Sequence, residues 1–452
     1  MKKKGKKWAI TASIAMCVSA LLPGCGNQNS GNKPVVVTLG FASGEVSTAE
    51  VDQFNKTHKN VQIKEVDVSQ PGKLQALLAS GNAPDIIRVQ GASELPGYVI
   101  KGIALDLQPY FDKDKKDFNP NDFMPVVNEY RFDKKTGVQG QGDLYGFDKD
   151  WSQDFMLWFN KKIFEQAGIP LPSTTKAMTW QQVFALAKKL TVVKNGTIQQ
   201  YGLGYFNGGT QAEESLILLQ LDQLGKSAWS DNYTKANFES PAAEQILQMW
   251  ANAVKGNYGP NDINEDANSP LNLFQSNKEA MLISGYWYSG DLRAAVKPNQ
   301  LSNYVLAPAP YMAGGKRVDP TGSATGAIIY SKTKHPQQAW EVFKYVFAGS
   351  PVDDRAKSGW GLPAFKSKMS ELPQKTAFDK QVITAQDAEL KYATPYLKYN
   401  PYVDLSTVNT ILDKYMRLVY MGHDTVPKAA KQIDTDLDML IQSSMEAAGV
   451  SK

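Results

Sequence analysis

Paired carboxylates are the residues in this sequence whose types and spacing could support catalysis. Such pairs occur at Asp148/Asp150, Glu213/Glu214 and Asp353/Asp354. Two carboxyl groups that face one glycosidic bond can act as the acid and the base of its hydrolysis. Acidic pairs are also common on protein surfaces, and spacing along the chain does not show that two of them face one bond. The pairs alone therefore do not indicate an enzyme.

Metal and nucleotide chemistry lack their usual sequence patterns. The histidines at 58, 335 and 423 are far apart and form no HExxH motif or Cys/His ligand spacing, so a dedicated zinc site is not expected. The sequence has no GxxxxGK[ST] loop and no Gly-x-Ser-x-Gly nucleophile motif. The glycine-rich stretch from Gly202 to Gly208 has the wrong spacing, and its aromatic residues would obstruct a phosphate. We expect no cofactor and no metal.

The composition indicates a folded globular protein with more than one domain. Of the 452 residues, 42% are hydrophobic and 21% are charged, which excludes intrinsic disorder and a collagen-like fibre. The net charge is +4, but the first 24 residues hold five lysines and no acid, so removing those five charges leaves residues 25–452 at −1. Such a body lacks the positive surface that binds nucleic acid through phosphates. We expect two or three domains and no nucleic-acid partner.

Residues 1–24 are predicted to be an export signal. Basic residues precede the apolar run from Trp8 to Leu22, which at 15 residues is short for a membrane-spanning helix. The signal ends in Leu22-Pro23-Gly24-Cys25, which resembles the bacterial lipobox, in which the cysteine becomes the lipidated N-terminus. Pro23 replaces the more usual Ala or Ser. An ordinary signal peptide with an incidental cysteine is the alternative.

The residues that follow the signal have the composition of a flexible tether. Residues 25–33 are rich in Gly, Asn and Ser. Because Cys17 lies inside the removed signal, Cys25 is the one thiol of the mature chain and no intrachain disulfide can form. We therefore expect a globular body that a lipid anchor holds at the outer, extracytoplasmic face of the cytoplasmic membrane.

From Val35 onward the chain alternates strand and helix patterns. This order predicts an α/β fold class, with doubly wound sheets flanked by helices. β-branched and apolar runs mark the strands, and capping residues mark the starts of helices. Strands are expected at 35–39, at 61–68 and from 86, and helix starts at Ser47 or Thr48, at Thr179 and at Pro336.

Two apolar stripes near the C-terminus predict amphipathic helices that pack in the core. Apolar residues recur there at spacings of three and four, the period of one helix face. The stripes are Val408, Ile411, Leu412, Tyr415 and Leu418, and then Pro427, Ala430, Ile433, Leu437 and Leu440.

Several motifs together carry a family resemblance. The chain resembles the extracellular solute-binding proteins of ABC importers, and specifically the carbohydrate-binding family that includes maltose-binding proteins. The resemblance covers nearly the whole mature chain and rests on the order of motifs that are weak one by one. They are Ala83–Arg88 followed by Gly102–Leu107, Leu157–Phe164 with Ala167–Pro170 and Thr179-Trp180, Ala280–Trp287 with Tyr286 in place of the usual Pro, Thr325–Ile329 with Ser331-Lys332 and Ala339-Trp340, and Gly361–Pro363.

This resemblance implies a two-lobed periplasmic-binding-protein-like fold, with the ligand clasped in a cleft between the lobes on hinge closure. The chain would cross between the lobes three times. The matching segments place lobe 1 at 34–148 and 309–347, and lobe 2 at 149–308 and 348–452. Such proteins catalyse no reaction and deliver their ligand to the permease of an ABC transporter. We expect a monomer whose partners are a carbohydrate, the permease subunits and, through the anchor, the membrane.

A carbohydrate site needs aromatic platforms and short polar side chains, because sugar rings have apolar faces and hydroxyl edges. The chain has 20 Tyr, 18 Phe and 9 Trp, so position must decide which of them serve. Trp287 matches the stacking Trp of the family. It lies between Ser284 and Gly290, in a stretch whose glycines and serines are poor core material. The aromatic residues of this stretch are therefore expected to face a cleft.

The other candidate residues lie at a strand end, at a crossing and on loops. Gln90 and Ser93 follow the third strand, at the carboxyl end where open α/β sheets bind ligands. Asp148, Asp150 and Trp151 fall at the first implied crossing, where an extended segment puts the two aspartates on one face; a solvated linker is the alternative. By the resemblance, further ligand contacts are expected from Ser43, Glu45, Phe206, Asn207, Gly322, Ser323, Trp360 and Tyr402.

The identity of the sugar is not specified by the sequence. After the third strand the chain lacks the Trp and the Asp-Arg pair of the maltose-binding pattern, which argues against maltose itself. Arginine is scarce near the candidate loops, which disfavours a phosphate ligand. The leading hypothesis is a lipoprotein that captures an oligosaccharide for import. A secreted carbohydrate-active enzyme or a surface adhesin is the alternative.

Overall fold

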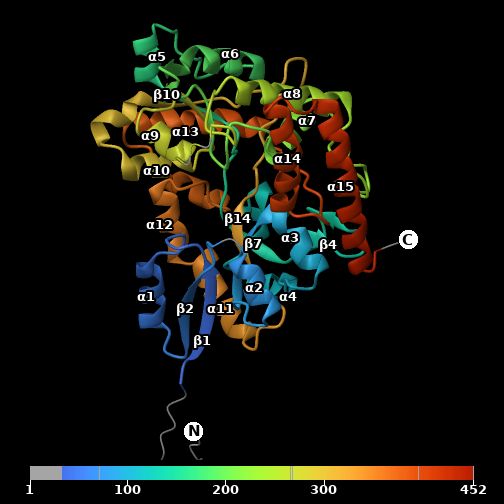
Figure 1. The fold of residues 1–452 in the computed structure, drawn as a ribbon. Coiled ribbons are helices and arrows are strands. Elements are labelled where there is room, and N and C mark those ends of the chain that lie inside the picture. Colours follow the sequence, from blue (N-terminus) through green and yellow to red (C-terminus); the bar gives the residue numbers. More distant parts are fainter. Residues whose placement is uncertain (1–32, 71, 265, 267, 395, 451–452) are drawn as a thin grey trace, which may run out of the picture.

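The computed structural model describes residues 33–450 except 71, 265, 267 and 395. Two bodies lie one above the other in Figure 1, each built on its own sheet. The export signal and Cys25 lie outside the described residues. None of the helices in the described part combines the length and apolar character that a membrane span requires.

The sheet of the first body has the order β2-β1-β3-β14-β7. Strand β1 pairs in parallel with β2 and β3, whereas β14 is antiparallel to both β3 and β7. The three strands predicted near the start of the body are therefore correct, and two strands from later in the chain complete the sheet. The strands are β1 (Val35–Phe41), β2 (Val61–Asp67), β3 (Ile86–Gln90), β7 (Gly146–Asp150) and β14 (Thr325–Ile329).

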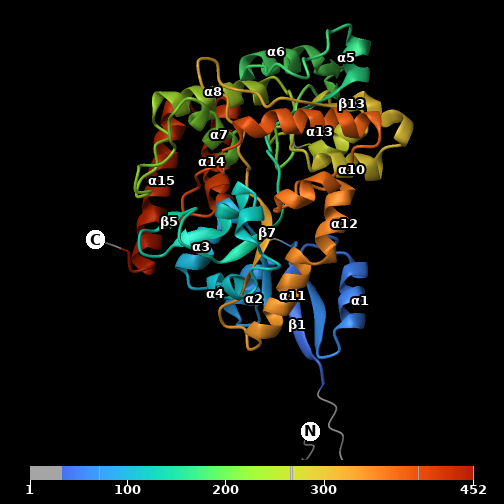
Figure 2. The ribbon, with the colours of Figure 1, turned by 180° about the vertical axis from the view of Figure 1, so that it is seen from behind.

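Helices cover both faces of this sheet, as Figures 1 and 2 show from opposite sides. Ser47 caps the first helix in a capping box with Glu50, so of the two predicted caps it is Ser47 that serves. The helices are α1 (Thr48–Thr57), α2 (Lys73–Ala79), α3 (Gly91–Ile100), α4 (Gln108–Lys113), α11 (Pro336–Ala348) and α12 (Ser350–Ser358), with short helices η1 (Pro120–Asp122) and η2 (Pro125–Tyr130). A small sheet of β4 (Arg131–Asp133), β5 (Val138–Gln139) and β6 (Asp143–Leu144) lies beside them.

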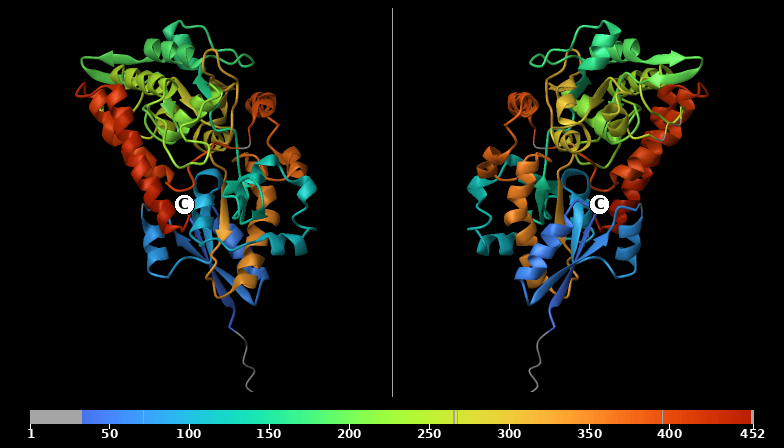
Figure 3. Two further views of the ribbon diagram at one scale, coloured as in Figure 1. Left: turned by 90° about the vertical axis from the view of Figure 1, so that its right-hand side faces the viewer. Right: turned by 90° about the vertical axis from the view of Figure 1, so that its left-hand side faces the viewer.

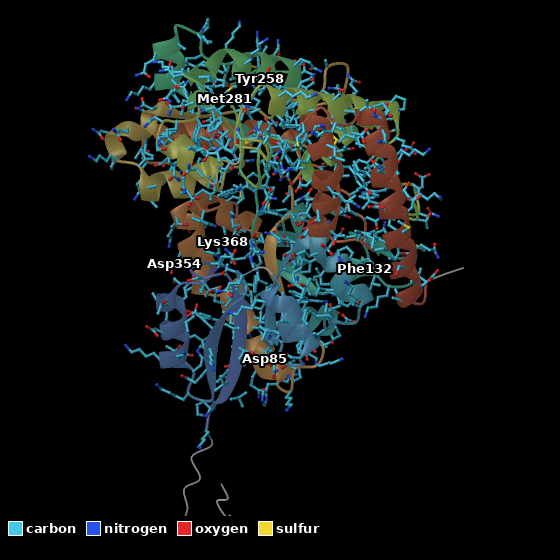
Figure 4. The ribbon with its side chains drawn as sticks, viewed as in Figure 1. Asp85, Phe132, Tyr258, Met281, Asp354 and Lys368 are labelled. Atoms are coloured by element: carbon cyan, nitrogen blue, oxygen red, sulfur yellow. The ribbon has the colours of Figure 1, made fainter. Side chains whose placement is uncertain are left out.

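Asp85, at the lower end of the first body in Figure 4, ties the central strands together. Its carboxylate accepts hydrogen bonds from Thr38 N at 2.8 Å and from Thr38 Oγ1 at 2.6 Å. Thr38 lies in β1, and Asp85 comes directly before β3. The motif Ala83–Arg88 therefore contains a residue that fixes how β3 enters the sheet.

The second body has a four-stranded sheet in the order β11-β12-β8-β13. Strand β8 lies in its centre and is antiparallel to both neighbours. The strands are β8 (Leu157–Asn160), β11 (Gly204–Tyr205), β12 (Met281–Ile283) and β13 (Tyr304–Ala307), and a separate hairpin joins β9 (Val192–Lys194) to β10 (Thr197–Gln200).

Most of the chain in the second body is helical. Thr179 caps α6 in a capping box with Gln182, as predicted. The helices are α5 (Lys161–Ala167), α6 (Trp180–Leu190), α7 (Glu214–Gln223), α8 (Pro241–Lys255), α9 (Pro270–Gln275), α10 (Tyr288–Ala295), α13 (Ala377–Glu389), α14 (Leu405–Tyr420) and α15 (Val426–Ala447), with η3 (Pro298–Asn303), η4 (Lys366–Glu371) and η5 (Leu390–Tyr392). Helix α15 runs from the second body down beside the first, as the side views of Figure 3 show.

Three connections join the two bodies: β7 to β8, β13 to β14 and α12 to α13. Strand β7 continues past residue 148 to Asp150. The hydrophobic core of the first body also includes Val352 and Phe365, which lie beyond residue 347. The lobe limits expected at 148 and 347 stay predictions, and the structure adds these neighbouring residues to the first body.

The C-terminal stripes form helices α14 and α15, but part of each predicted stripe is wrong. Leu418 and Leu440 are each 39% exposed, whereas Met416 and Ile441 are buried. An α-helix has 3.6 residues per turn, which is not a whole number. The spacing of its buried residues therefore varies between three and four along the sequence. The buried side of α15 runs through Ala430, Ile433, Leu437, Ile441 and Met445.

We expect two leucines of α15 to differ sharply in their contribution to stability. Leu437 is fully buried and Leu440 is 39% exposed. Leu437→Ala should lower the free energy of unfolding by about 2–5 kcal/mol, because it leaves a cavity. Leu440→Ala, the matched control, should change it by less than about 0.5 kcal/mol. Urea unfolding would measure both, and equal effects would contradict the assigned helix face.

Candidate functional site

Three aromatic side chains from separate segments meet at Trp287, which contacts both of the others. We call Phe206, Trp287 and Trp360 the aromatic group. The ring centroids of Phe206 and Trp287 are 5.5 Å apart at 75°, and those of Trp287 and Trp360 are 6.3 Å apart at 44°. Trp287 is half-buried and Trp360 is 39% exposed. These rings offer solvent-accessible faces on which an apolar surface could stack.

The environment of Trp287 corrects one expectation from the sequence. Its neighbours Tyr286 and Tyr288 do not face a cleft, because both are fully buried. Ser284 and Ser289 are fully buried as well. Small residues here allow segments to pack closely, since a Cβ at Gly285 would lie 2.1 Å from Ser152 Oγ. Of the aromatic residues between Ser284 and Gly290, Trp287 alone reaches solvent.

Polar side chains gather at the carboxyl ends of β1 and β3. We call Glu45, Arg88, Gln90, Ser93 and Ser323 the polar network. Arg88 Nε donates to both carboxylate oxygens of Glu45, at 2.8 and 2.9 Å. With its amide oriented to match its neighbours, Gln90 donates to Ser323 O at 2.8 Å and accepts from Arg88 at 2.9 Å. Ser93 N and Oγ approach Ser323 Oγ at 3.1 and 3.2 Å. Four predicted residues are thus joined in one network.

Arg88 is the member of this network that sequence reasoning missed. It lies two residues before Gln90 on the same strand, so both side chains point to the same face. That spacing was the available signal. Ser43, predicted beside Glu45, lies exposed on the loop after β1.

Gly322 lies where the connections between the bodies meet. Its N–H donates to Asp154 Oδ2 at 2.9 Å, and its carbonyl accepts from Tyr399 Oη at 2.9 Å. Asp154 also accepts from Ser152 Oγ at 2.8 Å. Burial raises the pKa of Asp154 to about 6. No motif marked Asp154, which lies four residues beyond the predicted Asp150.

The three residues predicted at the first crossing are either buried or ion-paired. Asp148 is 1% exposed, and neither carboxylate oxygen has a hydrogen-bond partner in the part of the chain that the structure describes. Burial raises the pKa of Asp148 well above its ordinary value. Asp150 is half-buried and forms an ion pair with Lys149. Trp151 is 6% exposed, and its Nε1 donates to Pro363 O at 3.0 Å.

The remaining candidates line two cavities. Tyr402 and Ser93 line a cavity of about 390 Å³ between α3 and the start of α14, which we call the inter-body cavity. Asn207 and Phe206 line another, of about 520 Å³, in the second body. The first volume falls within the range of small-molecule binding sites.

The chemistry of this region is suited to binding a ligand. Aromatic faces and neutral or internally paired polar groups suit a neutral ligand with many hydroxyl groups. Within residues 33–450 less the four undescribed positions, no group of three or more His, Cys, Asp or Glu is placed to hold a metal ion.

Comparison with known proteins identifies the family. The family model described as bacterial extracellular solute-binding protein matches residues 41–348, which is more than half of the chain. The chain belongs to this family. The maltodextrin-binding protein MdxE of Bacillus subtilis is 23% identical over 390 residues, covering 82% of this chain and 80% of MdxE.

Solved structures support the two-lobed fold of this solute-binding protein. The substrate-binding protein Lmo0181 of Listeria monocytogenes, in complex with cycloalternan, has a TM-score of 0.74 at 21% identity and covers 92% of this chain and 99% of its own. The maltose/maltodextrin-binding MalE domain of Bdellovibrio bacteriovorus, bound to maltotriose, has a TM-score of 0.68 at 17% identity and covers 90% and 100%. The predicted periplasmic-binding-protein-like fold is therefore confirmed.

We expect Glu213, beside the second-body cavity, to make stability depend on pH. Burial first, then the charges of Asp413 and Asp262, raises its pKa from 4.5 to about 8. Between pH 4.5 and 8 the unfolded chain loses this proton before the folded one does, so stability falls as pH rises, by up to about 1.4 kcal/mol per pH unit.

Glu213→Gln removes this titration. The variant should match the parent near pH 4.5 and exceed it by a few kcal/mol at pH 8, as measured by urea unfolding at each pH. The exposed Glu165→Gln is the matched control and should follow the parent throughout. A Glu213→Gln variant with the parent's pH slope would show that Glu213 is ionised in the folded state.

Proposed function

We propose that this protein captures a carbohydrate outside the cell and delivers it to the permease subunits of an ABC transporter. The observation that carries the proposal is that the aromatic group and the polar network lie near each other. Thr325 pairs with Gln90 of the network and with Asp150. Asp150 in turn lies against Gly361, the neighbour of Trp360. A sugar ring needs an apolar platform for its C–H face and paired donors and acceptors for its hydroxyls, and these two sets supply both. The sugars bound by MdxE, Lmo0181 and MalE support this choice of ligand.

The ligand is proposed to be an oligosaccharide rather than a single sugar. Trp287 and Trp360 offer two faces side by side, with ring centroids 6.3 Å apart. The inter-body cavity of about 390 Å³ begins at Ser93, which is also a member of the polar network. A chain of several sugar rings could therefore contact the aromatic group and the cavity together.

Arg88 is proposed to orient the sugar as a neutral hydrogen-bonding unit with Glu45. Because Glu45 compensates its charge at 2.8 Å, the pair presents donors and acceptors without a net charge. A phosphate would prefer an uncompensated cation. This pairing favours a neutral sugar over a phosphorylated one.

The two bodies are proposed to act as hinged lobes of a monomer. Trp287 belongs to the second body, and most of the polar network belongs to the first. A ligand that contacts both sets gains more from a closed arrangement, which is the condition for ligand-driven closure. Ligand capture of this kind requires no catalysis, and incubated oligosaccharides should be recovered intact.

The Trp287→Ala variant tests this function. Losing the platform removes about 1.5–3 kcal/mol of apolar burial, so binding should weaken by roughly ten- to a hundredfold. Isothermal titration with maltotriose and with other oligosaccharides would measure the change against the parent.

A surface variant provides the control for this titration. Leu171→Ala removes a 43% exposed apolar side chain that belongs to neither the aromatic group nor the polar network, so affinity should be unchanged. The unfolding midpoint of Trp287→Ala should stay close to that of the parent. If Trp287→Ala binds as tightly as the parent, Trp287 is not the stacking residue. Either Trp360 then provides the stacking surface, or the aromatic group does not stack on the sugar.

The protein is proposed to be a lipoprotein at the outer face of the cytoplasmic membrane. The family description as extracellular supports an extracytoplasmic place. The lipobox-like Leu22–Cys25 supports the anchor.

Replacing the proposed anchor residue should release the protein. Cys25→Ser removes the thiol to which lipid would attach. The variant should appear in the soluble fraction after cell fractionation, whereas the parent stays with the membrane. Pro23→Ala, which brings the motif closer to the usual lipobox, is the matched control and should remain bound. Membrane retention of Cys25→Ser would contradict lipid anchoring.

A further inference from the structure

A groove that is separate from the aromatic group lies elsewhere on the protein. Two adjoining cavities of about 460 and 260 Å³ share Asp231, Tyr233, Tyr396 and Lys398 as lining residues. We call this pair of cavities the tyrosine groove. No residue of the aromatic group lines either cavity.

The tyrosine groove lies on the opposite side of the molecule from Trp287 and Trp360. Its smaller cavity is lined by Phe132 of β4 and by Val138 and Gln139 of β5. Figures 1 and 2 place these strands at the side of α15, away from α10 and α12, and Figure 4 labels Phe132 there. Since Trp287 precedes α10 and Trp360 follows α12, the two regions are separate.

The groove is formed by both bodies. The lining residues from β4 and β5 belong to the first body. Leu397 and Tyr399 also line the groove, and they pack in the core of the second body. Tyr396 reaches across, because a Cβ at Gly140 would lie 2.2 Å from Tyr396 Oη. The shape of the groove therefore depends on how the two bodies are oriented.

Tyr233 holds an unusual backbone conformation at the junction of the two cavities. Its φ is +58°, a left-handed value that bulky residues rarely adopt. Asn400 Nδ2 donates to Tyr233 O at 3.0 Å, and Tyr233 N donates to Ser230 O at 2.9 Å, which fixes this conformation. Such strain is found where the position of a side chain matters for function.

The charges that line the larger cavity balance. Asp222 and Asp231 are matched by Lys226 and Lys398. Burial raises the pKa of Asp222, and the positive charges of Lys398 and Lys316 work against the rise. A balanced lining favours neither an anion nor a cation, and carboxylates would repel a phosphate.

The lining also offers an unused hydroxyl group. Thr394 lines the larger cavity, and its Oγ1 is buried without a hydrogen-bond partner among the residues that the structure describes. A buried hydroxyl without a partner is unfavourable, and a ligand hydroxyl can relieve this. Together with two tyrosine rings and the four charged side chains, the groove has the chemistry of a sugar site.

We propose that the tyrosine groove is a second carbohydrate site, which takes a neutral mono- or disaccharide with its ring against Tyr233 and Tyr396 and its hydroxyls toward Asp222 and Lys398. Because both bodies line the groove, binding there is coupled to the orientation of the bodies. Coupling between two sites is reciprocal, so sugar in the groove changes the affinity at the aromatic group and the reverse.

The test uses the purified protein with Trp287→Ala, which weakens the first site. Maltose and mannobiose are titrated separately by calorimetry up to about 20 mM, because a solvent-open site of this size is expected to bind with a millimolar Kd. The residual binding of one of these sugars should weaken at least about tenfold on adding Tyr396→Ala and should change little on adding Tyr396→Phe, which keeps the ring. Leu171→Ala, outside both the groove and the aromatic group, should leave it unchanged.

Unfolding midpoints establish that the variants are folded. If Tyr396→Ala does not fold, Lys398→Ala replaces it, because Lys398 is exposed and its loss leaves the core intact. The proposal is overturned if neither sugar binds to the Trp287→Ala protein, or if the groove variant binds as the Trp287→Ala protein does. In the second case the residual binding belongs to the first site, and the function proposed for the aromatic group is unaffected.

Discussion

The buried side chain of Gln153 holds together the segments that set the relative orientation of the two bodies. Its Nε2 donates to Asp319 O at 2.9 Å and to Glu389 O at 3.0 Å, and its Oε1 accepts from Gln386 at 2.7 Å. One amide thus joins the β7–β8 connection, the β13–β14 connection and the end of α13. Two reciprocal backbone bonds between Trp151 and Leu362 attach the third connection. Because hydrogen bonds are directional, these contacts fix how the connections lie against one another.

The sequence predicts most of the local structure of the first body but not how its sheet is completed. Val35–Phe41 and Ser47 show their strand and cap through residue types that act locally. Strand β14 completes the same sheet. Its Thr325 pairs with Gln90 of β3, which lies 235 residues earlier in the chain. No local pattern records such a pairing, because it is decided by tertiary packing. The misjudged exposure of Leu440 has a similar cause: which side of a helix is buried depends on its neighbours.

The candidate site was predictable in its residue types but not in its pairings. Trp287 and Phe206 meet, and Gln90, Ser93 and Ser323 share a network, although no sequence pattern showed these contacts. Sequence reasoning treated the small residues around Trp287 as signs of a cleft, whereas they permit the close approach of Gly285 to Ser152. It also overlooked Arg88, whose pairing with Glu45 on the loop after β1 is a tertiary contact that no local pattern records.

The proposed site is divided between the bodies, so the proposed closure would bring its two parts together. The polar network lies at the strand ends of the first body, Trp287 belongs to the second, and Trp360 lies on the connection that leaves α12. A ligand held by only one body would favour no particular orientation, since equal affinity for two states shifts neither. A ligand that spans both gains contacts only as the bodies approach, and this difference in contacts can drive closure about the segments that Gln153 joins.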